Sequence, residues 1–128
     1  MADRRRVLVV DDEAHIVHVV SLKLQNAGFE VITAADGEEG LALASAQLPD
    51  LIVTDYQMPF VSGLEMCTRL RQQQQTAHIP ALMLTARGFS IPPQELAATN
   101  IKHVLSKPFS PRDILARVQE LIDHAEAA

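Results

Sequence analysis

The sequence predicts an α/β protein in which a parallel sheet is covered by helices on both faces. Two observations predict this fold class. Short apolar runs alternate along the chain with segments of helical periodicity, and most of these runs lack the polar–apolar alternation of a half-exposed strand. Strands that alternate with helices form parallel sheets with crossover helices packed on the sheet.

Length and composition fit one globular domain over residues 1–128. The chain has 128 residues, is 48% hydrophobic and carries a formal charge of −5, so disorder and a general nucleic-acid surface are excluded. Its single cysteine, Cys67, excludes an intramolecular disulfide and suits a reducing compartment. No apolar run approaches the roughly 20 residues of a membrane helix. We expect a cytoplasmic protein with no membrane contact.

Five apolar runs are predicted to be strands. The second mixes polar and apolar residues, which is typical of an edge strand, and the basic run Arg4–Arg6 before the first is expected to be a solvated lead-in. The predicted strands are Val7–Val10, Phe29–Ala34, Leu51–Thr54, Ala81–Leu84 and Ile101–Leu105.

Capping residues mark the helices between the strands. Gly28 is expected to stop the first helix, and Asp36 to cap a second that carries Leu41, Ala44 and Leu48. Ser62 opens the third with a capping-box pattern, and Ser110 opens the last.

The fourth helix departs from this regular pattern. Pro92 and Pro93 delay its start, and Asn100 is expected to end it, leaving about two turns.

Polar residues stand where four of the predicted strands end. Asp11 and Asp12 follow the first strand, Asp55 the third, Thr85 the fourth and Lys107 the fifth. In an open α/β sheet, ligands bind beyond the carboxyl ends of the strands. A parallel sheet would therefore gather three carboxylates, a hydroxyl and an ammonium at one edge, although unrelated surface carboxylates are the simpler alternative.

Carboxylates in such a cluster must either retain a proton or bind a hard cation. Two unit charges about 4 Å apart repel by roughly 4 kcal/mol at an effective dielectric constant of 20. Ligands that are all oxygen favour Mg²⁺, for which Mn²⁺ could substitute. An aspartate can also act as a nucleophile and form an aspartyl phosphate. In sheet order Asp55 lies between the acidic pair and Thr85 with Lys107, which makes it our candidate nucleophile.

Four motifs together resemble the receiver domain of two-component response regulators, of the chemotaxis single-domain type. The resemblance covers about residues 5–125, and each motif has its expected place in the chain order. The motifs are Val7-Leu8-Val9-Val10-Asp11-Asp12-Glu13, Asp55-Tyr56-Gln57-Met58-Pro59 followed by Gly63, Leu84-Thr85-Ala86, and Lys107-Pro108-Phe109.

The resemblance implies a flavodoxin-like (βα)5 fold with strand order 2-1-3-4-5 and a phosphoacceptor at Asp55. It implies that Asp12, Asp55 and the backbone carbonyl of Gln57 bind Mg²⁺, with Asp11 acting through water. Thr85 and Lys107 would contact the phosphoryl group, and the Lys107–Pro108 peptide would be cis.

The resemblance also implies partners. A histidine kinase or histidine phosphotransfer protein would donate the phosphoryl group in a phosphorelay, and an unknown downstream protein would receive the signal. A phosphorylation-dependent dimer is a further expectation. Beyond self-phosphorylation from a phosphodonor and autodephosphorylation, no enzyme activity is expected.

One family feature is absent. Receivers usually carry an aromatic residue three positions before the lysine, and here that position holds Val104. We therefore hypothesise that phosphorylation shifts residues 86–91 without an aromatic rotation at position 104. By the same resemblance, Gln57, Ala86 and Arg87 flank the phosphoryl site as switch or tuning positions.

Two other functions compete with this interpretation. Haloacid-dehalogenase-type phosphatases also use an aspartate nucleophile with Mg²⁺, but they begin with Asp-x-Asp after the first strand. A flavodoxin needs a hydroxyl-rich phosphate loop there, which Asp11-Asp12-Glu13 would oppose. The sequence leaves open the kinase, the output, and whether the chain acts alone or as part of a longer regulator.

Overall fold

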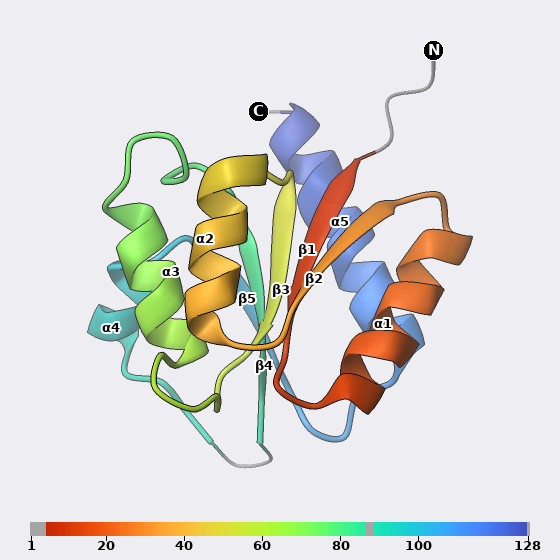
Figure 1. Ribbon diagram of the computed structural model, residues 1–128, viewed down its shortest axis with the longest axis horizontal. Coiled ribbons are helices and arrows are strands. Elements are labelled where there is room, and N and C mark those ends of the chain that lie inside the picture. The colour runs from red at the N-terminus through yellow and green to blue at the C-terminus, as the bar shows by residue number, and fades with distance from the viewer. Residues whose placement is uncertain (1–4, 87–88, 128) are drawn as a thin grey trace.

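The computed structural model describes residues 5–86 and 89–127, which form a parallel sheet between two layers of helices (Figure 1). The strand order is β2-β1-β3-β4-β5, as predicted. The elements are β1 (Arg6–Val10), α1 (Ala14–Asn26), β2 (Glu30–Ala34), α2 (Gly37–Gln47), β3 (Leu51–Asp55), α3 (Gly63–Arg71), β4 (Ala81–Thr85), α4 (Pro93–Ala97), β5 (Ile101–Ser106) and α5 (Pro111–Ala127).

All neighbouring strands in the sheet are parallel, so their carboxyl ends meet at the lower edge in Figure 1. β2 lies at one edge, as its mixed sequence predicts, and its first four residues are partly or fully exposed. The central strands β1, β3 and β4 are almost entirely buried. Their continuous apolar runs follow from this, because helices cover both of their faces.

The core has two layers, one on each face of the sheet. On one face Leu8 and Ile52 pack against Met66, Cys67 and Leu70 of α3. The opposite face packs against α1 and α5, and its buried members include Val7, Val9, Leu51, Val53, Leu82, Val20, Leu24, Ile114 and Val118. Cys67 is fully buried in this core, as its apolar helical position predicts.

The predicted caps are formed. The Asp36 carboxylate accepts a hydrogen bond from the Glu39 N–H at 2.8 Å, and the Ser62 hydroxyl accepts one from the Glu65 N–H at 3.1 Å. Ser110 and Asp113 exchange two such bonds at the start of α5. Each bond satisfies a backbone N–H that the helix cannot pair internally.

Two helix ends differ from the prediction. α2 ends at Gln47, and Leu48 lies beyond it with φ +49° and a half-exposed side chain, so Leu48 does not extend the apolar face. α4 comprises five residues, shorter than the predicted two turns. It ends at Ala97, before the buried Asn100, whose side-chain amide donates to the Ile79 carbonyl.

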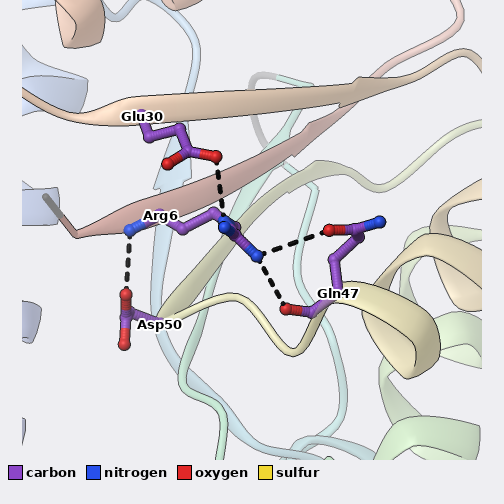
Figure 2. A network of polar contacts seen from close by, with 4 residues as sticks. All are labelled: Arg6, Glu30, Gln47 and Asp50. Carbon is purple, nitrogen blue, oxygen red and sulfur yellow. Dashed lines mark hydrogen bonds and ion pairs between the residues drawn. The ribbon is translucent and has the colours of Figure 1, made fainter.

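Arg6 is not a solvated lead-in residue. Its guanidinium donates to Glu30 at 3.1 Å and to the Gln47 carbonyl at 3.1 Å, while its backbone N–H donates to Asp50 at 2.8 Å (Figure 2). Arg6 therefore joins the starts of β1 and β2, the end of α2 and the turn into β3. This network lies at the amino-terminal edge of the sheet, away from the polar strand ends. Arg4 lies outside the described residues.

Candidate functional site

The predicted site residues meet at the carboxyl edge of the sheet. Asp11 directly follows β1, Asp55 is the last residue of β3 and Thr85 is the last residue of β4. Lys107 follows the last residue of β5. β1, β3, β4 and β5 are consecutive neighbours in the sheet, so four distant segments deliver these side chains to one edge.

Three carboxylates form the centre of the site. One carboxylate oxygen from each of Asp11, Asp12 and Asp55 lies within 4.8 Å of the other two. Asp11 is buried, Asp55 is partly buried and Asp12 is exposed. The Glu13 N–H donates to Asp11 at 2.9 Å, and this bond orients the buried carboxylate.

Burial and mutual repulsion perturb two of these carboxylates. Loss of solvation, followed by the charges of Asp11 and Asp12, raises the pKa of Asp55 from 3.8 to about 7, although Lys107 opposes this rise. Loss of solvation is also the main cause that raises the pKa of Asp11 to about 6, against the Glu13 hydrogen bond. Without a cation, the cluster therefore favours retaining a proton close to neutral pH.

The donor set fits a hard divalent cation. Two carboxylates from the loop after β1 and one from the end of β3 converge within 4.8 Å of one another, and their burial and mutual repulsion, which raise two of the pKa values, would be offset by a cation. Oxygen ligands of this kind suit Mg²⁺ or Mn²⁺. The residues present are thus compatible with divalent metal binding.

Thr85 and Lys107 lie on the other side of Asp55 in the sheet. The Thr85 hydroxyl is buried and donates a long hydrogen bond of 3.4 Å to the Leu105 carbonyl. The Lys107 N–H donates to the Thr85 carbonyl at 3.1 Å, which fixes the backbone spacing of the two residues. Lys107 is exposed, and the Lys107–Pro108 peptide is cis, as the resemblance implies.

The segment after β3 approaches the site closely. The Gly63 N–H donates to the Tyr56 carbonyl at 2.9 Å, and a Cβ on Gly63 would lie 2.2 Å from the Asp55 carbonyl oxygen. Only glycine therefore fits where α3 begins. A cavity of about 400 Å³ opens beside this segment, and its lining residues are Asp12, Tyr56, Gln57, Met58, Pro59 and Ser62.

The switch and tuning positions are placed only in part. Gln57 and Ala86 are exposed, and Val104 is half-buried in β5, opposite Met83 of β4. Arg87 lies outside the described residues.

One contact at the site had no signal in the sequence. The rings of Tyr56 and Phe89 lie with centroids 4.5 Å apart and planes inclined by 43°. Tyr56 directly follows Asp55, and Phe89 follows β4. Tyr56 lies inside the motif that begins at Asp55, but nothing in that motif links it to Phe89, which belongs to none of the motifs. Only the proximity of two adjacent strand ends would have pointed to the pair.

Comparison with protein families decides the classification. The family model of the response regulator receiver domain matches residues 7–119 of this chain. The chain belongs to this family. The match is compatible with the fold and the site geometry described above. It favours a receiver domain over a haloacid-dehalogenase-type phosphatase or a flavodoxin.

Relatives of the receiver include transcriptional regulators. The chain is 41% identical over 124 residues to the alkaline phosphatase synthesis transcriptional regulatory protein PhoP of Bacillus subtilis, covering 97% of this chain and 51% of PhoP. It is 42% identical to the DNA-binding dual master transcriptional regulator RpaA of Synechocystis, covering 91% of this chain and 48% of RpaA. The receiver thus spans about half the length of these relatives.

A solved structure matches the receiver over nearly its full length. The chemotaxis response regulator CheY4 of Vibrio cholerae superposes with a TM-score of 0.85 at 40% identity, covering 93% of this chain and 99% of that one. In the receiver, none of the described helices combines the length and hydropathy that a bilayer crossing demands.

Proposed function

We propose that residues 5–125 act as a phosphoacceptor module in which Asp55 accepts a phosphoryl group in a Mg²⁺-dependent reaction. The observation that carries this proposal is the meeting of Asp55 with Asp11 and Asp12 on one side and with Thr85 and Lys107 on the other. This arrangement supplies a nucleophile, a cation site and two donors for phosphoryl oxygens, which phosphoryl transfer requires.

The proposed step is a displacement at phosphorus. A carboxylate oxygen of Asp55 forms a bond to phosphorus as the bond from phosphorus to the donor's histidine nitrogen breaks, and the electron pair leaves with that nitrogen. The product is an aspartyl phosphate. The Lys107 ammonium and the Thr85 hydroxyl each donate a hydrogen bond to a phosphoryl oxygen. The Thr85 hydroxyl must first release its hydrogen bond to the Leu105 carbonyl.

We assign the cation to Asp12, Asp55 and the backbone carbonyl of Gln57, with Asp11 acting through water. When bound, Mg²⁺ or Mn²⁺ supplies positive charge that offsets the crowded carboxylates and the phosphoryl oxygens. The side chain of Gln57 and that of Arg87 tune hydrolysis of the aspartyl phosphate, which is the domain's own autodephosphorylation.

The proposed partners follow from this chemistry. A sensor histidine kinase or a histidine phosphotransfer protein supplies the phosphoryl group, and a downstream protein or a second copy of the chain reads the altered surface. No contact with nucleic acid is proposed for the receiver itself, whose formal charge of −5 does not favour binding to phosphates.

Acetyl phosphate tests the proposal against the enzyme alternatives. With Mg²⁺ present, the receiver is expected to gain a single phosphoryl group that is stable in acid and labile in base, and an Asp55→Ala variant should gain none. Continuous hydrolysis of small phosphate esters would instead indicate a phosphatase, and a yellow purified protein would indicate a flavodoxin.

A further inference from the structure

We propose that the ring contact between Tyr56 and Phe89 couples the state of Asp55 to the segment that follows β4, and that the contact belongs to the unphosphorylated state. This inference rests on the proposed phosphorylation of Asp55. The coupling is assigned to a ring pair outside β5, because the position in β5 at which receivers usually carry an aromatic residue holds Val104 here.

The backbone of Tyr56 is held on both sides. Its N–H donates to the Leu84 carbonyl at 2.9 Å, and its carbonyl accepts from the Gly63 N–H at 2.9 Å. A change at the neighbouring Asp55 therefore cannot displace this backbone freely. The half-buried ring is the part of Tyr56 that remains able to rotate.

Phe89 is held near Thr85 by its own backbone. Its N–H donates to the Ala86 carbonyl at 3.1 Å, and Ala86 directly follows Thr85. Two residues later, Ile91 is buried. The Phe89 ring itself is 39% exposed, so it is free to leave Tyr56 without opening the core.

These contacts connect Asp55 to the residue that follows Thr85. Asp55 is joined to Tyr56 by a peptide bond, and the Tyr56 ring contacts the Phe89 ring. The Phe89 N–H donates a hydrogen bond to the carbonyl of Ala86, the residue after Thr85. In the resting structure the Thr85 hydroxyl points to the Leu105 carbonyl. When this hydroxyl turns to a phosphoryl oxygen on Asp55, the Ala86 carbonyl moves with it, and the ring pair separates.

The other aromatic side chains cannot take this role. Phe29 and Phe109 pack against the core beside α1 and α5, and Phe60 is 94% exposed. Among the described residues, Tyr56 with Phe89 is the one aromatic ring pair. The coupling is therefore assigned to this pair.

Thermodynamic linkage predicts the direction in which removal of the ring contact changes phosphorylation. A contact made only in the resting state opposes the phosphorylated state, so removing the contact must favour phosphorylation. An aromatic pair of this kind corresponds to about a 2- to 10-fold change in an equilibrium constant.

The experiment measures the affinity for beryllofluoride, a phosphoryl mimic, in the presence of Mg²⁺. The concentration dependence of the melting temperature gives that affinity for wild type and for four variants, namely Phe89→Leu, Phe60→Leu, Tyr56→Leu and the Tyr56→Leu/Phe89→Leu double variant. Phe89→Leu is expected to bind about 2- to 10-fold more tightly. Phe60→Leu, the same change on an exposed ring without a ring partner, is expected to bind like wild type.

A double-mutant cycle and a spectroscopic signal complete the test. In a Tyr56→Leu background, Phe89→Leu should have no further effect on affinity. Tyr56 is the only tyrosine and the chain has no tryptophan, so intrinsic emission reports this ring alone. Resting Phe89→Leu should already show the emission that beryllofluoride induces in wild type.

The outcomes separate the inference from the proposed function. Unchanged or weaker affinity in Phe89→Leu, or an equal gain in Phe60→Leu, overturns the coupling role while phosphorylation stands. A wild-type protein that fails to bind beryllofluoride with Mg²⁺ overturns the proposed function, and the inference falls with it.

Discussion

The backbone N–H of Lys107 donates a hydrogen bond to the carbonyl oxygen of Thr85 at 3.1 Å. This bond extends the pairing of β4 with β5 past the last strand residue and fixes the two residues proposed to contact the phosphoryl group relative to each other. Because β4 also pairs with β3, the same sheet sets their positions relative to Asp55. The sheet thus sets the spacing of Asp55, Thr85 and Lys107.

Replacing the ammonium of Lys107 tests its role toward Asp55. Lys107 lowers the pKa of Asp55 against the effects of burial and repulsion, so Lys107→Met should raise that pKa further. Phosphoryl uptake from acetyl phosphate should slow by about 100-fold, the usual loss when one donor to a developing charge is removed. Lys102→Met, an exposed lysine on β5, is the matched control. Equal rates in wild type and Lys107→Met would contradict the assignment.

The metal-free protein should lose stability as pH rises from about 4 to about 7. Asp11 and Asp55 have pKa values raised from 3.8 to about 6 and about 7, so in this window the folded state binds more protons than the unfolded state. Their contribution is therefore unfavourable above pH 7, by at most about 3 kcal/mol for Asp11 and about 4 kcal/mol for Asp55, and solvent screening of the partly exposed Asp55 lowers its share. Urea unfolding with a chelator present measures it.

The matched variant for this pH effect carries Asp11→Asn and Asp55→Asn. The difference in unfolding free energy between wild type and this variant isolates the two carboxylates from the other titrating groups. That difference should fall as pH rises through the window. A difference that stays flat or increases would refute the raised pKa values.

Removing one carboxylate should separate charge crowding from metal binding. Asp12→Ala is expected to raise the melting temperature of the metal-free protein, because it relieves repulsion of Asp11 and Asp55, and to abolish the response to Mg²⁺. Wild type should gain about 1.4 kcal/mol at a Mg²⁺ concentration ten times its Kd. Asp123→Ala, an exposed carboxylate on α5, should retain that gain. A wild-type melting temperature indifferent to Mg²⁺ would rule out the site.

The side chain of Gln57 should control how long the aspartyl phosphate survives. It is exposed beside the cavity that also contacts Asp12, so an amide there can orient an attacking water. Gln57→Leu should lengthen the lifetime several-fold, and replacing Arg87 should also change it. Mg²⁺ affinity should stay largely the same, because the proposed ligand at position 57 is its backbone carbonyl rather than its side chain. Equal lifetimes in wild type and both variants would disprove the tuning role.

The sequence predicted where the polar side chains of the candidate site lie, for a physical reason. The strands β1, β3 and β4 are buried apolar runs, and the polar residue at or just after the end of each marks where the chain leaves the core. Asp11, Asp55 and Thr85 were therefore placed correctly without coordinates. The order of the strands was not available from the runs themselves and came from the family resemblance.

What the sequence missed depends on contacts between distant segments. Arg6 is bonded to Glu30, Gln47 and Asp50, none of which a local pattern connects to it. The contact between Tyr56 and Phe89 arises because β3 and β4 end side by side. Local propensity also does not encode that α2 ends at Gln47 and leaves Leu48 in a left-handed conformation.

Peptide mapping of the phosphorylated protein tests the central claim most directly. After treatment with acetyl phosphate and Mg²⁺, followed by borohydride reduction of the acyl phosphate, mass spectrometry should locate the modification at Asp55 alone. A phosphoryl group on another residue, or none in protein that binds Mg²⁺, would contradict the account.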